Sequence, residues 1–139
     1  MPEREDFFRN ELVEELRLVE TKMREEPTLE KKIYYFSAAF GITGRTYKYV
    51  FSKDVLLADI VMQNVYNMLN EQMARLKSGD RNCLPNPVVF ERICDAMRDL
   101  ANGFESDGDV IGPLENMATA GFSTTGAGNY LLEKGLITL

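Results

Sequence analysis

Apolar residues recur every three or four positions along most of this chain. The pattern predicts four principal helices, at about residues 6–26, 29–40, 53–77 and 87–102. In the first and last of these segments the charged residues lie largely off the apolar stripe, as expected for helices that pack by one side. The spacing therefore predicts an all-α protein.

Local signals support several of these boundaries. Ser52 can cap the third helix with its side-chain oxygen, and Asn86 followed by Pro87 is a typical start for the fourth. Gly41 is suited to the left-handed conformation that ends a helix, so we expect the second helix to stop there. Residues 42–51 are rich in β-branched and aromatic types, and we expect a connector that can include a helical turn.

The last third of the chain contains more glycine. Gly103 is expected to close the fourth helix, with a loop over 104–113 and two short helices at 114–120 and 128–134. Short connections favour antiparallel neighbours. We therefore predict one domain over 1–139, an antiparallel up-and-down bundle of four principal helices plus a short C-terminal helical pair.

The segment 53–77 is more apolar than a surface helix requires. Neutral amides occupy the face where charges usually lie, at Gln63, Asn64, Asn67 and Asn70. Exposed apolar surface of this breadth usually marks an interface, so we predict a homo-oligomer, most simply a two-fold dimer. The candidate interface residues are Leu57, Val61, Met68 and, in the apolar tail, Ile137.

The composition of the chain limits its expected partners and its expected location in the cell. The chain is 45% hydrophobic and 27% charged, with a net charge of −6, which disfavours nucleic acid as a partner. It begins with a charged run, and its most apolar window is interrupted by polar residues, so we expect neither a secretion signal nor a membrane span. Two cysteines, Cys83 and Cys94, do not make a disulfide framework, and we expect free thiols in the cytoplasm.

Histidine is absent, and this excludes several classes of function. Ser-His-Asp and Cys-His catalysis and histidine-ligated zinc all require an imidazole. Any chemistry must rest on carboxylates, lysine, hydroxyls or thiols. We assign no catalytic residue and expect no cofactor.

Two clusters nevertheless carry candidate chemistry. Six tyrosines and eight phenylalanines are present, and half of them fall between 34 and 51 beside basic residues, an arrangement that can hold a planar ligand. The candidate ligand-binding residues are Arg45, Tyr47, Tyr49 and Asp59, the last as a general base if burial raises its pKa. The alternative is that the aromatic residues of the second helix fill a core and that the tyrosines anchor the connector with their hydroxyls in water. Asp59 would then belong to an exposed or subunit-facing polar strip.

Three alternating carboxylates, Glu105, Asp107 and Asp109, resemble the opening ligands of a calcium loop. An EF-hand would continue with glycine and glutamate where this chain has Val110 and Asn116. The pattern is therefore typical of a weak divalent-metal site or of a solvated acidic loop.

The C-terminal segment 113–137 offers a further alternative. Its Gly121-Phe122-Ser123 turn, followed by a helix ending in Gly135-Leu136-Ile137, resembles the second half of a helix-turn-helix, which implies nucleic-acid binding. The segment's only base is Lys134, whereas a DNA reader needs cations for phosphates.

In the order and length of its helices the whole chain resembles small uncharacterised archaeal helical-bundle proteins. That resemblance implies the fold and leaves the function open. We expect a non-enzymatic structural or interaction protein that assembles with itself. The alternatives are a helix-turn-helix nucleic-acid binder and a small-molecule or metal site built from carboxylates and tyrosines.

Overall fold

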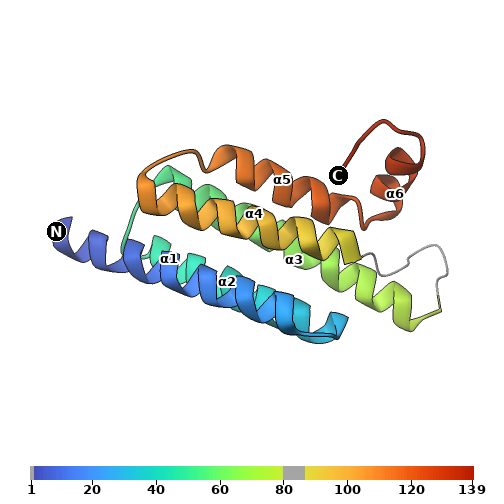
Figure 1. The fold of residues 1–139 in the computed structure, drawn as a ribbon, viewed down its shortest axis with the longest axis horizontal. Coiled ribbons are helices and arrows are strands. Elements are labelled where there is room, and N and C mark those ends of the chain that lie inside the picture. The colour runs from blue at the N-terminus through green and yellow to red at the C-terminus, as the bar shows by residue number, and fades with distance from the viewer. Residues whose placement is uncertain (1, 80–86) are drawn as a thin grey trace.

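The computed structural model describes residues 2–79 and 87–139, and these ranges form six helices (Figure 1). The helices are α1 (Pro2–Glu25), α2 (Leu29–Tyr47), α3 (Lys53–Lys77), α4 (Pro87–Ser106), α5 (Ile111–Phe122) and α6 (Gly126–Glu133). The all-helical class is therefore confirmed for the described residues. The predictions about Cys83 and the Asn86 cap lie outside them.

Five of the helices pack side by side as a closed ring. Helix α1 packs against α2 and α4, α3 packs against α2 and α5, and α4 packs against α5. Helix α5 was expected as half of a small terminal pair, but it forms the wall between α3 and α4 (Figure 1). The core is therefore enclosed by five of the described helices, and α6 follows the C-terminal end of α5.

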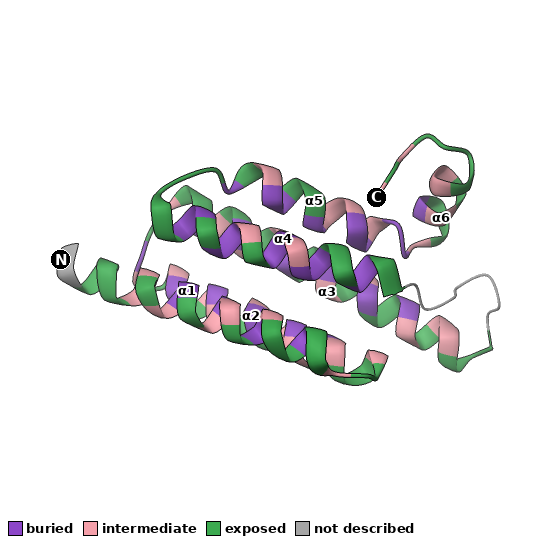
Figure 2. Cartoon of the chain, viewed as in Figure 1, coloured by how far each residue is buried: buried purple, intermediate pink, exposed green. Residues whose placement is uncertain are grey.

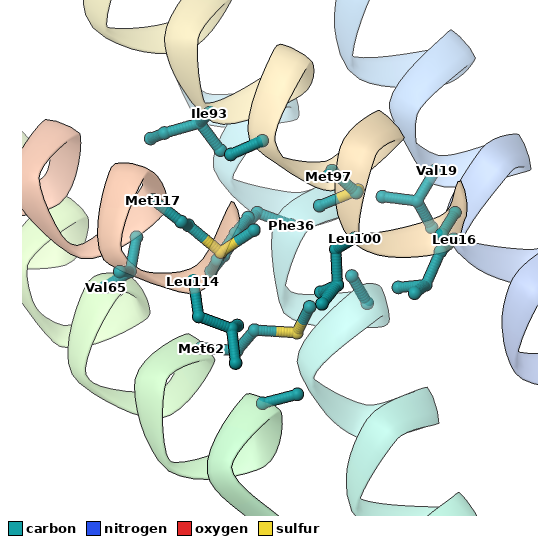
Figure 3. Close-up of a cluster of buried hydrophobic side chains, with 14 of the residues drawn as sticks. Leu16, Val19, Phe36, Met62, Val65, Ile93, Met97, Leu100, Leu114 and Met117 are labelled. Carbon is teal, nitrogen blue, oxygen red and sulfur yellow. The ribbon is translucent and has the colours of Figure 1, made fainter. Parts of the chain in front are cut away.

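The core is a continuous layer of large apolar side chains (Figure 3). Each of the five ring helices contributes at least one fully buried residue to it: Leu16, Phe36, Met62, Met97 and Met117. Figure 2 shows the corresponding pattern, with buried and exposed positions alternating along every long helix. The apolar stripes read from the sequence are thus the surfaces on which the ring closes.

Helix α2 continues seven residues past its predicted end at residue 40, so the expectation of a stop at Gly41 was wrong. Thr43 and Thr46 extend the buried stripe of α2, and each hydroxyl donates to the backbone carbonyl four residues earlier. These bonds satisfy both hydroxyls in the apolar interior. Tertiary burial therefore outweighs the poor helix propensity of the Gly41–Tyr47 segment.

Helix α4 also extends beyond its predicted end, to Ser106. The left-handed residue that ends it is Asp107, with φ of 54°, and the Gly108 amide donates to the Gly103 carbonyl at 2.8 Å. Gly103 itself is helical. A Cβ there would collide with the backbone carbonyl of Asp109, so the glycine permits a close approach of the following loop.

Gly41 and Gly103 were both wrongly predicted to end helices. Replacing each of them with alanine is expected to have opposite effects on stability. Gly41 has open space around it, so Gly41→Ala is expected to raise the free energy of unfolding by about 0.5–1 kcal/mol. Gly103→Ala forces the Asp109 carbonyl to move and is expected to lower that free energy by roughly 1–3 kcal/mol. Urea unfolding followed by circular dichroism measures both. Destabilisation by Gly41→Ala would contradict a helical residue 41.

Candidate self-association face

Two of the predicted ligand-binding residues hold the end of α2 against α1. Arg45 Nη2 lies 2.7 Å from Glu15 Oε2. The Tyr49 ring stacks on Phe8 with centroids 4.0 Å apart, and the Arg4 guanidinium lies 4.8 Å from the Tyr49 centroid. Both side chains therefore have structural partners on α1.

The other two predicted ligand-binding residues have different surroundings. Tyr47 meets Phe51 edge to face, with centroids 5.8 Å apart. Asp59 packs against Gly44 of α2, where its Oδ1 is buried without a hydrogen-bond partner, and burial raises the pKa of this carboxyl. The four residues thus make separate local contacts, and a ligand-binding role for them stays a prediction.

The three carboxylates predicted as metal ligands, Glu105, Asp107 and Asp109, also have separate structural roles. Glu105 pairs with Arg17 at 2.7 Å, and hydrogen bonding to that guanidinium lowers the pKa of Glu105. Asp109 Oδ1 accepts a hydrogen bond from the backbone amide of Ile111, the first residue of α5, while Asp107 forms the left-handed turn. Within residues 2–79 and 87–139, no group of three or more histidine, cysteine or acidic residues is placed to hold a metal ion.

The helix-turn-helix candidate has two helices, α5 and α6, joined by residues 123–125. Gly128 lies so close to the end of α5 that a Cβ would collide with the Phe122 carbonyl. The segment's base, Lys134, places its ammonium 5.6 Å from the Tyr130 ring centroid. The helix–turn–helix order agrees with the resemblance, and nucleic-acid binding stays a prediction.

Helix α3 carries two stripes with the same spacing. Its buried stripe consists of Val55, Ala58, Met62, Val65, Leu69 and Gln72. A second, exposed stripe consists of Leu57, Ile60, Asn64, Asn67, Glu71 and Ala74, which we call the outer seam. Both alternate steps of three and four. At about 100° per residue, the offset of two places them roughly 200° apart, on opposite sides of the helix.

The first four residues of the outer seam have an unusual chemistry for a solvent-facing surface. Leu57 and Ile60 are 36% and 47% exposed, and Asn64 and Asn67 are exposed amides. Every exposed α3 residue from 57 to 70 is uncharged in a chain that is 27% charged. The sequence interpretation named Leu57 and the amides, but it did not separate Ile60 and Asn64 as members of one seam.

Comparison of the chain with protein-family models, curated proteins and solved structures found no match. The resemblance to archaeal helical-bundle proteins therefore stays a prediction. Separately, none of the helices in the described ranges combines the length and the apolar character needed to cross a bilayer.

The remaining predicted interface residues lie in two places. Val61 and Met68 are half-buried on α3 and flank the outer seam. Ile137 lies in the C-terminal tail, where the adjacent Thr138 and Leu139 line a depression with residues of α4 and α5. The structure therefore brings three of the four predicted interface residues together on α3 and places Ile137 apart from them.

The partly buried carboxyl of Asp59 predicts a pH-dependent stability. Because its folded-state pKa is raised, the protonated form favours the fold, and this stabilisation is lost as the pH rises through the raised pKa. Asp59→Asn is expected to raise the free energy of unfolding more at pH 7 than below pH ~3.9, where Asp59 is mostly protonated in both the folded and the unfolded state.

Thermal unfolding at pH 7 and at pH 3.5 measures this difference. The matched control is Asp54→Asn, which removes an exposed carboxylate from the first turn of the same helix. That control is expected to destabilise slightly at pH 7, because it loses a favourable charge at the positive end of the helix dipole. Equal effects of Asp59→Asn at both pH values would show that the carboxyl is not desolvated.

Proposed function

We propose that this chain is a non-enzymatic interaction protein that assembles with itself through the outer seam of α3, most simply as a two-fold dimer. The observation that carries the proposal is the exposed, uncharged heptad spacing of Leu57, Ile60, Asn64 and Asn67. The separate structural contacts of the predicted ligand-binding residues support a non-enzymatic role.

The spacing favours another helix as the occupant of this face. Steps of three and four residues present one continuous seam to a neighbouring helix, and apolar or amide side chains at those positions can insert between its residues. The buried stripe of α3 has this spacing where the helix packs against α2 and α5. The outer seam repeats the arrangement toward solvent.

The chemistry of the seam favours a second copy of the same chain. Each copy carries a net charge of −6, so charge opposes contact between two copies least where the contact lies over an uncharged area, such as the four seam residues from Leu57 to Asn67. An amide both donates and accepts hydrogen bonds, so Asn64 and Asn67 can pair with the same residues of a second molecule. Asparagine at a seam position also selects one register, at some cost in affinity.

The proposal includes two finer expectations from the sequence. We expect α1 to α4 to form the predicted antiparallel up-and-down framework, because their connections are short. We also expect a cytoplasmic location, in which Cys94 stays a free thiol. Neither expectation depends on the outer seam.

The double substitution Leu57→Glu with Ile60→Glu tests the seam. Both side chains are partly exposed in the single chain, so the fold should persist while two like charges enter the interface from each copy. We expect the dissociation constant of the dimer to rise by at least about a hundred-fold, equivalent to roughly 3 kcal/mol. Analytical ultracentrifugation over a range of concentrations measures this constant.

The matched control is Leu18→Glu, which adds a charge at a 59% exposed leucine on α1. It should leave self-association unchanged. Circular dichroism establishes that all variants remain helical. A wild-type chain that sediments as a monomer at 100 µM, or a double variant that associates as tightly as the wild type, would overturn the proposal.

A further inference from the structure

A cavity of about 480 Å³ lies between α1, α2 and α4. The end of α1 and the start of α4, which line it, lie at the end of the bundle opposite the N-terminus (Figure 1). The cavity is bounded by the end of α1, the link into α2 and the first turns of α2 and α4. None of the sequence-based candidates falls there. Its volume is within the range of roughly 300–1,000 Å³ that small-molecule sites occupy.

The walls of the cavity are mainly apolar. Pro27 and Leu29 lie on one side, and Pro87 and Phe90 lie on the side of α4. Cys94, only 2% exposed, also lines it, and burial raises the pKa of its thiol to about 11. At neutral pH the thiol is therefore protonated and behaves as a small apolar group.

The two cations at the cavity are already engaged with protein groups. Arg24 lies 2.7 Å from Glu20 and 2.8 Å from Asp95, and the Lys32 ammonium donates to the Met23 carbonyl at 2.5 Å. Glu26 and Glu91 also line it, so the formal charges of the described lining residues balance. An anionic ligand would therefore meet no uncompensated positive charge, and the net charge of the chain repels it.

We propose that this cavity binds a small, uncharged and largely aromatic or aliphatic molecule against Phe90, Leu29 and Cys94. Lys32 stands at its polar edge. An ammonium group has three donors, so Lys32 can bind Met23 and still donate to a carbonyl or ether oxygen of the ligand. The site is independent of self-association, because α3 does not line it.

Two fluorescent probes with the same ring system test the charge preference. N-phenyl-1-naphthylamine is uncharged, and 1-anilinonaphthalene-8-sulfonate adds one sulfonate. Fluorescence titration of the full chain is expected to give saturable one-to-one binding of the uncharged probe, at least about tenfold tighter than the sulfonate. Tighter binding of the sulfonate would overturn the assigned ligand class.

Substitutions at one position test the location. Cys94→Ala leaves the cavity open and should retain the uncharged probe, whereas Cys94→Met directs a longer side chain into it and should weaken binding at least about tenfold. Leu29→Trp, at a half-buried rim position, is a second blocking variant if Cys94→Met does not fold. Circular dichroism and thermal unfolding establish which variants are folded.

The seam variant with Leu57→Glu and Ile60→Glu separates this proposal from the proposed function. It should bind the uncharged probe with wild-type affinity even if it no longer associates. Loss of probe binding in that variant would place the probe on α3 and overturn the cavity assignment. Equal binding by wild type and by a folded blocking variant, or no saturable binding at all, would do the same.

Discussion

The bundle depends on the contact that α5 makes with α3 and α4. Leu114 and Met117 of α5 are fully or almost fully buried, and they complete a core that the four longer helices leave open on that side. The approach is close because α5 has no side chain at Gly121. A Cβ at this position would lie 3.1 Å from the Val65 methyl groups, so a larger residue would require Val65 or α5 to shift by a few tenths of an ångström. The core therefore closes through a short helix with a small residue at its contact point.

The elements that sequence reasoning predicted well are those where periodicity and caps agree. Helix α3 begins and ends at the predicted residues because Ser52 accepts the Asp54 amide and an apolar stripe runs through the whole segment. The end of α2 was missed because Gly41 is a local signal, whereas the buried positions of Thr43 and Thr46 depend on α3 beside them. Local propensity is a weak guide where a neighbouring helix supplies the burial.

The two candidate sites were also only partly predictable from the sequence, because their locations depend on how the helices pack. The breadth of apolar residues on the segment 53–77 was visible in the sequence, but periodicity alone does not say which of two stripes faces the core. The structure assigns the inward side to Met62 and its neighbours and the outward side to Ile60 and the amides. The cavity was beyond prediction for a different reason. Lys32 and Cys94 are 62 positions apart, and only the packing of the bundle brings their helices to one end.

The positions of the two proposed sites constrain how they can influence each other. The outer seam lies on α3, whereas the cavity is lined by the end of α1 and the starts of α2 and α4. Of the helices that line the cavity, α2 is the one that packs against α3 in the described residues. It reaches α3 closely at Gly44, where the Oδ1 atom of the half-buried Asp59 is buried. A shift of the start of α2 on ligand binding would therefore reach α3 first through the ion pair of Glu30 with Lys77, 2.7 Å long and one residue from Leu29 at the cavity, and only then at Asp59. The buried stripe and the outer seam lie on opposite sides of α3, so their side chains do not touch each other. Coupling between the cavity and the outer seam would then require α3 to move as a rigid helix.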